Sequence, residues 1–485
     1  MKTLKVALKP SAKKKYARRA AAPGGRSPES SRIPLSEAIN MVRSLDSKTS
    51  SYLQAMGEEM HALIRSLYPI CRSITGNGVR ETLRLINEQI PLQIFEVPSQ
   101  TQVFDWTVPR EWNIRDAYIK NRQGERLVDF QKCNLHVLGY SIPVHQEMTL
   151  DELKSHLFTL PEYPKYIPYR TSYYRESWGF CVSHEQWQEL MARPDEVYEV
   201  CIDSSLESGS LTYAECFLPG QTEEEVLFSC QVCHPSLAND NLSGISLGVA
   251  LAKTLEQSPR RYSYRFLFIP GIIGSITWLC LNESHLWRIK HGLVLNCVGD
   301  PGNIHYKKSR RGDAEIDQAI THVLKHHGAD YSILDFYPYG YDERQYCSPG
   351  FNLPVGVLTR SQHGKFPEYH SSGDNLDFVR PEALADSYAV ALLAIAVLEK
   401  NSVYINQNPK GEPLLSKRDL YSVRVGWLTD KDLEMAMLWV LNFSDGAHSL
   451  LDIAERSGID FFRISLAAEK LKQANLLTGQ QNGDK

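Results

Sequence analysis

The stretch that most constrains this chain is residues 230–245, which read CQVCHPSLANDNLSGI. The apolar run before it, residues 226–229, indicates a buried strand, and residues 244–255 carry apolar side chains at helical spacing. We therefore expect His234 at the end of a strand and Asp240 in a loop that opens a helix. Because ligands of open α/β sheets bind at the carboxyl ends of strands, these two side chains could share a metal ion.

Strands and helices alternate over residues 195–400. The apolar runs typical of buried parallel strands are 226–229, 264–269 and 293–298, and the segments with helical spacing are 244–255, 273–283, 316–326 and 387–399. Residues 36–91 also have a helical pattern. Together these segments predict an α/β domain of residues 36–91 and 205–400, whose mostly parallel sheet is covered by helices on both faces.

Residues 92–204 have a different composition from the segments on either side. Short runs rich in Val, Ile, Tyr, Phe and Trp alternate with Pro, Asn and Gly, which predicts a β-rich inserted domain. Six aromatic residues between positions 163 and 178 could line a substrate cleft. Packing within a β core explains them more simply, because aromatic side chains are common in such cores.

The C-terminal region predicts a winged-helix domain over residues 416–480. Residues 401–415 are polar and contain two prolines, as a linker would, and amphipathic helices are expected at 430–443, 449–457 and 460–477. Residues 417–485 hold nine Lys and Arg against ten Asp and Glu. DNA binding needs an excess of positive charge, so we favour a role in packing or protein contact and expect no nucleic-acid partner.

Residues 1–35 are predicted to form a disordered basic tail. Residues 1–32 hold ten Lys and Arg against one Glu, whereas residues 33–485 carry a net charge of −13. The segment has no continuous apolar stretch, which argues against a secretory signal. An organelle transit peptide or a nucleic-acid contact is the less favoured alternative.

The cysteines and the hydropathy of the chain indicate a cytoplasmic protein without a membrane partner. Ten cysteines without a secretory context are expected to be reduced thiols. No apolar run approaches the roughly 18 residues of a membrane span. The hydrophobic fraction of 42% suffices for packed cores and excludes a wholly disordered chain.

Two further polar loops concentrate acid–base groups where strands of the sheet should end. They are residues 341–350, YDERQYCSPG, and residues 367–377, PEYHSSGDNLD. A catalytic zinc site usually has three protein ligands of imidazole and carboxylate type and keeps one position for water. His234, Asp240 and His370 would make such a set.

A carboxylate beside such a metal accepts the proton of the water that the metal acidifies. Glu343 is our first candidate and Glu368 our second, since Glu343 lies in a polar cluster with Asp342 and Arg344. Arg344 could hold a substrate carboxylate or the oxyanion, because its planar fork suits planar anions. The simpler reading of Arg344 is an ion pair with Asp342 or Glu343.

Each of these features also has an ordinary structural explanation. A His before Pro can be a strand-end residue with satisfied hydrogen bonds, and Asp240 can be a helix cap. The string CQVCH matches the attachment motif of c-type haem, but it follows a buried strand in a chain without an export signal. We therefore interpret Cys230 and Cys233 as buried thiols that pack as small hydrophobic groups.

The loop HPSLANDNLSG and the downstream string YHSSGDN resemble zinc aminopeptidases of the M28-like fold. The whole of residues 55–477 is more closely similar to aminopeptidase-like proteins of the DUF4910 type. That resemblance implies a β-rich DUF2172 insertion, a C-terminal winged helix and genes near those of polysaccharide or natural-product synthesis. The strings VFDWTVPREWNIRDAY, from residue 103, and YRTSYY, from residue 169, look like hallmarks of the insertion.

The resemblance implies that His234 is the first His ligand, Asp240 the metal-bridging Asp and His370 the last His ligand. The family at large uses two zinc ions and five ligands, and this chain departs from it twice. Where a Glu-Glu pair is expected the chain reads FIPGIIGS, with Gly271, and where an Asp ligand is expected it has Asn296. Only one zinc ion is therefore expected, and Asp300, just beyond the second position, is a lesser candidate.

These observations predict a metal-dependent hydrolase, an aminopeptidase or amidase that acts on a peptide or an aminoacyl amide. Two alternatives belong to other classes. The protein could be a binding protein that has lost catalysis with its acidic ligands, or a regulator that uses its winged helix on DNA. The inserted and C-terminal domains could also mediate a homo-oligomer.

Overall fold

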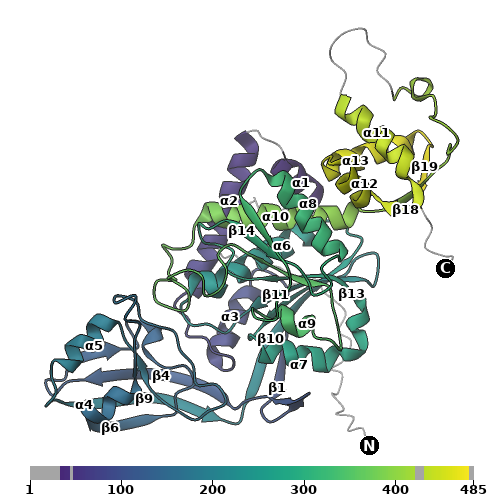
Figure 1. The fold of residues 1–485 in the computed structure, drawn as a ribbon. Helices are drawn as coiled ribbons and strands as arrows, with labels where there is room; N and C mark the ends of the chain where they lie inside the picture. The colour runs from purple at the N-terminus through teal and green to yellow at the C-terminus, as the bar shows by residue number, and fades with distance from the viewer. Residues whose placement is uncertain (1–32, 44–46, 421–430, 480–485) are drawn as a thin grey trace, which may run out of the picture.

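The computed structural model describes residues 33–43, 47–420 and 431–479 of the chain (Figure 1). An α/β body lies in the middle, a β-rich domain lies at one end and a small helical domain lies at the other. The predicted tail falls almost wholly outside the described residues. Its predicted boundary is too late, because helix α1 (Leu35–Arg43) begins at Leu35, which is buried.

The body is built on a mixed sheet of eight strands. Their spatial order is β1 (Gln93–Pro98), β10 (Ser210–Leu218), β12 (Ser263–Ile269), β11 (Glu225–Gln231), β13 (Ile289–Leu295), β16 (Val355–Thr359), β14 (Ile304–Lys307) and β15 (Tyr331–Leu334). The four central strands, β12, β11, β13 and β16, run parallel, as predicted. Strands β1, β10 and β14 pair antiparallel with their inner neighbours, so the edges of the sheet depart from the predicted parallel order.

Helices cover both faces of this sheet, which confirms the predicted α/β class. One face carries α1, α2 (Ser47–Leu67), α3 (Asn77–Asn87), α6 (Gly244–Glu256), α8 (Glu315–His327) and α10 (Pro381–Lys400), and the other carries α7 (Ile273–Asn282) and the short α9 (Glu343–Tyr346). In β11, Val226 and Phe228 pack on the first face and Leu227 on the second. Burial on both sides explains why the strands appear in the sequence as unbroken apolar runs.

Helix α10 is the one candidate membrane span among the described residues. By length and hydropathy it could span a membrane, although no such segment was expected. In the structure 78% of its most apolar window is buried inside the protein, between α2 and α8. A helix that is apolar on all sides is typical of a core enclosed by other elements.

The inserted domain has its own four-stranded antiparallel sheet, in the order β5 (Arg126–Asp129), β4 (Glu111–Lys120), β9 (Val197–Glu207) and β6 (Val144–Thr149). Short elements surround it: α4 (Leu150–Leu153), α5 (His184–Met191), β2 (Gln102–Val103), β3 (Trp106–Thr107), β7 (Leu157–Phe158) and β8 (Phe180–Cys181). Strand β1, which we had assigned to the insertion, instead pairs with β10 in the main sheet.

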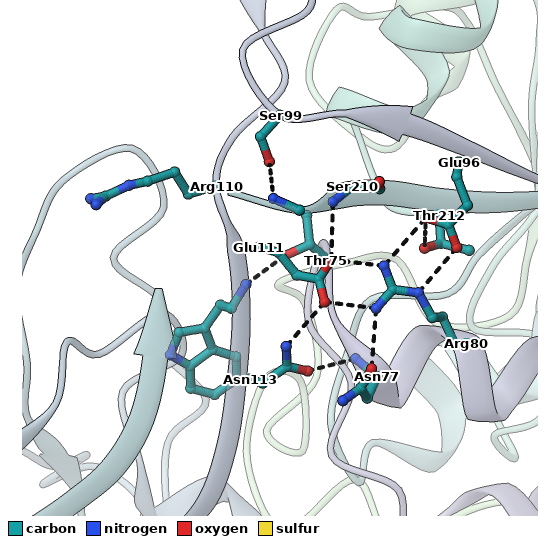
Figure 2. Close-up of polar contacts among 12 residues, drawn as sticks. Thr75, Asn77, Arg80, Glu96, Ser99, Arg110, Glu111, Asn113, Ser210 and Thr212 are labelled. Carbon is teal, nitrogen blue, oxygen red and sulfur yellow. Dashed lines mark hydrogen bonds and ion pairs between the residues drawn. The ribbon is translucent and has the colours of Figure 1, made fainter. Parts of the chain in front are cut away.

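A partly exposed ion-pair network joins the inserted domain to the body (Figure 2). The guanidinium of Arg80, on α3, donates two hydrogen bonds of 2.7 Å to Glu111 at the start of β4 and two of 3.0 and 3.2 Å to Glu96 on β1. Glu111 also accepts from the amide of Ser210, where β10 begins. Arg80 thus connects a helix of the body with the first strand of the inserted sheet, and lowers the pKa of Glu111 to about 2.

The C-terminal domain has the predicted three helices, α11 (Lys431–Phe443), α12 (Leu450–Ser457) and α13 (Phe461–Gln473). Its sheet has the order β18 (Asp445–Ser449), β17 (Val403–Asn406) and β19 (Leu477–Gly479). Strand β17 lies within the segment that we had predicted to be a linker. The polar, proline-containing flank of that segment hid a strand of only four residues, whose partners lie about 40 and 70 residues further along the chain.

This domain packs on the body through its helix-turn-helix. The amide of Phe461, at the start of α13, donates to Nε2 of His322 on α8 at 2.9 Å, and Nδ1 of the same ring lies 2.6 Å from Glu455 on α12. Arg43 on α1 donates to Asp460 at 3.0 Å. In DNA-binding proteins of this type the first residues of the second helix contact bases, and here these residues contact the body.

Replacing Glu111 by Gln keeps the shape of the side chain but leaves Arg80 with one carboxylate partner. We expect the free energy of unfolding at pH 7 to fall by about 1–3 kcal/mol, the usual cost of losing a partly buried charged partner. Since the pKa of Glu111 is lowered from 4.5 in the folded state, its stabilisation is present above pH 4.5 and declines as the pH falls toward 2. Urea unfolding of the two proteins at pH 7 and pH 3 measures both effects.

Glu81→Gln is the matched control for this substitution. Glu81 lies on the same helix and pairs with Arg84 at the surface, where ion pairs contribute little. Its effect at pH 7 should be much smaller than that of Glu111→Gln. Equal losses in the two variants would mean that the junction is no stronger than a surface ion pair.

Candidate metal centre

The structure brings His234, Asp240 and His370 together at the carboxyl end of the parallel strands. His234 follows β11, Asp240 lies in the turn Ala238–Ser243 before α6, and His370 lies in the loop between β16 and α10. Nε2 of His370 lies 3.0 Å and Nδ1 of His234 lies 3.8 Å from the two oxygens of Asp240. One ligand atom from each residue falls within 4.8 Å of the other two.

The electrostatics of the three side chains suit a metal ion. Burial lowers the pKa of His234 to about 4, so its imidazole is neutral and has a lone pair to donate near pH 7. Burial alone would raise the pKa of Asp240, but the neighbouring His234 and His370 lower it to about 2. Oδ1 of Asp240 is buried without a hydrogen-bond partner among the described residues. Two imidazoles and a carboxylate with a free oxygen match the protein ligands of a single zinc ion.

Asp374 holds the loop that carries Asp240. Its buried carboxylate accepts hydrogen bonds from the amides of Asn239, at 2.6 Å, and Asp240, at 2.9 Å. Burial raises the pKa of Asp374 to about 8. The side chain of Asn239 donates in turn to Asp300, which also accepts from Ser361. Asp300, our lesser candidate, is therefore placed behind the ligand loop and supports it.

The inserted domain completes the wall of this centre through Tyr169. The amide of Tyr169 donates to the carbonyl of His370 at 2.7 Å, and the neighbouring Pro168 forms a β-bridge with Ser371. The ring of Tyr169 stands edge-on to both imidazoles, with centroids 5.2 Å away in each case. The sequence predicts that this aromatic segment lines a cleft or packs in a β core, and it does not indicate that Tyr169 lies beside His234 and His370.

The predicted proton acceptors lie in different surroundings. Glu343 is fully buried, and its Oε1 forms an ion pair with Lys307, which also donates to the carbonyls of Tyr337 and Tyr339. Glu368 is half-buried, and within the described part of the chain its carboxylate has no hydrogen-bond or ion-pair partner. Neither residue belongs to the cluster of three ligands.

Arg344 does not form the ion pair that we considered as its simpler explanation. Its neighbour Glu343 pairs with Lys307, and Oδ1 of Asp342 accepts from the amide of Ile272 at 2.7 Å. Arg344 itself is half-buried on α9, and the described residues include no ion pair to it. A role in binding an anion stays a prediction for this residue.

Neutral amides occupy the region where the resemblance implies two more acidic ligands. A side chain at Gly271 would place its Cβ 2.8 Å from Nε2 of Gln231, so that space is already filled. Asn296 is fully buried and donates to Oε1 of Gln231 at 3.3 Å. Because an amide brings no negative charge to a second dication, the residues present favour one zinc ion.

Asp374→Asn should weaken metal binding without unfolding the protein. The amide of Asn can accept only through its oxygen, so one of the two backbone amides of the ligand loop would lose its partner. We expect zinc affinity to fall about 10- to 100-fold, as is usual when residues that orient metal ligands are changed. Competition with a chromogenic chelator measures it. Asp377→Asn, an exposed change three residues away, is the control and should keep the affinity of the wild type.

Comparison with known proteins agrees with this geometry. Residues 61–401 match the family described as domain of unknown function DUF4910, and residues 402–479 match a winged helix-turn-helix family. The second match begins just before β17, and so includes most of the predicted linker. Identification of the insertion as a DUF2172 domain stays a prediction.

A protein of Clostridium acetobutylicum, provisionally named a polysaccharide biosynthesis protein with aminopeptidase-like domain, is 54% identical over 421 residues, which cover 87% of this chain and 96% of that protein. The crystal structure of a provisionally named peptidase from this species has 51% identity and a TM-score of 0.85, and the match covers 92% of this chain and 100% of that one.

More distant structures share the fold of the body. A zinc aminopeptidase from Bacillus subtilis has 12% identity and a TM-score of 0.53, and the match covers 70% of this chain and 95% of that chain. A peptidase M28 precursor from Shewanella amazonensis has 13% identity and a TM-score of 0.51, with 75% and 97% covered. The chain therefore belongs to the DUF4910 family, with a peptidase fold in its body and a winged helix-turn-helix domain at its C-terminal end.

Proposed function

We propose that the protein is a zinc-dependent hydrolase, an aminopeptidase or amidase, that uses one metal ion held by His234, Asp240 and His370. The observation that carries the proposal is the buried cluster of two imidazoles and a carboxylate, with Oδ1 of Asp240 lacking any hydrogen-bond partner. The zinc aminopeptidase of Bacillus subtilis, which shares the fold, supports the choice of metal and reaction.

The residues of the chain would each contribute a defined part. A zinc ion bound there supplies a Lewis acid for the scissile carbonyl and lowers the pKa of a water molecule toward neutrality. His234 and His370 offer imidazole nitrogens, Asp240 offers a negative charge, and Asp374 keeps the carboxylate of Asp240 in place. Tyr169 shields the imidazoles from solvent on the side of the inserted domain.

The substrate class that we propose is an amide, either a peptide or an aminoacyl amide. The Clostridium relative is named for polysaccharide biosynthesis, which adds N-acylated amino sugars to the compounds worth testing. All ten cysteines are free thiols in the structure, and this supports our proposal of a cytoplasmic location. Glu368 and Arg344 are proposed as residues that contact the substrate.

A second candidate, a binding protein without catalysis, is favoured by one observation. The chain has Gly271 and Asn296 where the two-zinc family has acidic ligands, and a reduced site can bind metal without turning over substrate. The alternative of a DNA-binding regulator receives less support, since the start of α13 contacts the body.

His370→Ala should reduce bound zinc from about one ion per chain to well below half and abolish hydrolysis. Removal of one of three protein ligands leaves a site that holds zinc poorly. Elemental analysis of the purified proteins measures the metal, and release of product from aminoacyl anilides, dipeptides and N-acetylated amino sugars measures activity. Chelation of the wild type should abolish activity, and one equivalent of zinc should restore it.

His145→Ala is the control, because His145 lies on β6 of the inserted domain and is exposed. It should retain both zinc and activity. An unchanged zinc content in His370→Ala would refute the ligand assignment. Stoichiometric zinc without hydrolysis of any compound would favour the binding protein over the enzyme.

A further inference from the structure

The end of strand β12 has no acidic residue, but a carboxylate from another loop packs against it. After Ile269 the chain continues Pro270-Gly271-Ile272, without a carboxylate. This carboxylate belongs to Asp342, immediately before α9, whose Oδ1 accepts the amide hydrogen of Ile272 at 2.7 Å. The side chain of Asp342 is fully buried.

The second oxygen of Asp342 has no hydrogen-bond partner among the described residues. The same holds for the buried atoms Oδ1 of Asn296, Oδ1 of Asp240 and Oε2 of Glu343, although the other oxygen of Glu343 is paired with Lys307. Buried carboxylate and amide oxygens are nearly always hydrogen-bonded in proteins. These oxygens therefore indicate partners that come from outside the chain, such as a metal ion, a water molecule or a substrate.

The end of β12 lies against the loop that carries His234. The amide of Gly271 donates to Sγ of Cys233, the neighbour of His234, at 3.2 Å. A Cβ on Gly271 would lie 2.8 Å from Nε2 of Gln231, whose Oε1 accepts from Asn296 at 3.3 Å. Since Asp342 binds the amide next to Gly271, its carboxylate lies at the same end of the sheet as the ligand cluster.

We propose that Asp342, rather than its neighbour Glu343, is the acid–base residue of the reaction, and that Gln231 and Asn296 position it beside the metal ligands. This inference rests on the proposed hydrolase function. The end of β12 has no acidic residue to act as general base, and the inference gives this role to Asp342 from a different loop.

The surroundings of the two neighbouring carboxylates favour Asp342. Burial raises the pKa of Asp342 to about 6, which brings it near neutrality, where a general base works best. Glu343 is bound to the buried Lys307. A proton on Glu343 would leave the lysine as an uncompensated buried charge, and that is strongly unfavourable.

The reaction balances with Asp342 as the only proton carrier. One proton of the attacking water moves to Oδ2 of Asp342 while the water oxygen bonds to the amide carbon and the π pair of the carbonyl moves onto its oxygen. Asp342 then gives this proton to the amide nitrogen. The oxygen pair re-forms the carbonyl as the C–N bond breaks, and the nitrogen keeps the bonding pair. The products are a carboxylic acid and an amine, and Asp342 returns to its starting state.

Asp342→Asn and Glu343→Gln form a matched pair for the test. Both keep the shape of the side chain and remove one negative charge, at adjacent positions. Asn at position 342 can still accept the amide of Ile272 through its oxygen. Each zinc-loaded variant is compared with the wild type for zinc content, for kcat on the best compound of the substrate panel and for affinity to acetohydroxamate by calorimetry.

For Asp342→Asn we expect the zinc content of the wild type, a kcat reduced about 100-fold or more, and acetohydroxamate bound about tenfold more weakly, because a general base is lost. Glu343→Gln should mainly lower the temperature of unfolding and should reduce kcat far less. A kcat of Asp342→Asn within threefold of the wild type, or a larger loss in Glu343→Gln, would overturn the inference.

Two further measurements keep this test decisive. If Asp342→Asn does not fold, Gln231→Leu replaces it, and a kcat equal to that of the wild type would count against the inference. If zinc-loaded wild type hydrolyses no compound, the proposed function fails. The acetohydroxamate measurement then decides on Asp342 alone, and equal affinity in wild type and Asp342→Asn would refute its role.

Discussion

The buried carboxylate of Asp374 is the contact on which the candidate metal centre depends. It lies four residues after His370 and accepts the amides of Asn239 and Asp240, so it joins two loops that are about 130 residues apart in the chain. The same pair of hydrogen bonds therefore sets the distance between His370 and Asp240. Without these hydrogen bonds, the irregular turn would not fix the carboxylate of Asp240 between the imidazoles of His234 and His370.

The contacts that attach the inserted domain to the body include one beside the candidate metal centre and one at the start of the inserted sheet. Tyr169 pairs through its backbone with His370, which places part of the insertion against the metal ligands. Arg80 joins the first strand of the inserted sheet to helix α3 and strand β1 (Figure 2). These attachments lie on different segments of the insertion, and the first places Tyr169 against His234 and His370.

The centre has two unlike halves. One half holds imidazoles and a carboxylate, which suit a zinc ion, and the other holds Gln231 and Asn296, whose amides carry no charge. A second dication would be repelled by the first without enough negative charge to compensate. The carboxylate of Asp342 lies beyond these amides, where its Oδ1 accepts the amide hydrogen of Ile272 at the end of β12.

Much of the body could be predicted from local patterns. Strands β11, β12 and β13 appear as apolar runs because both of their faces are buried, and α6, α7 and α8 appear through helical spacing. The clustering of His234, Asp240 and His370 could be predicted because they lie in polar loops that follow apolar segments. Strands β1 and β17 were assigned to the wrong units, since short strands with mixed polarity do not reveal their partners.

The sequence by itself thus determined the α/β class, the winged helix and the types of side chain available for a metal. Buried strands and amphipathic helices each have a local pattern of apolar residues that can be recognised without the rest of the chain. Only the tertiary structure decided which hydrogen bonds and ion pairs each carboxylate forms. Glu343 had seemed the better proton acceptor, but Lys307 binds it, whereas Asp342 reaches Ile272 at the end of β12. These pairings join residues 36 and 70 positions apart, and no local pattern encodes them, because they arise from the packing of separate loops at one edge of the sheet.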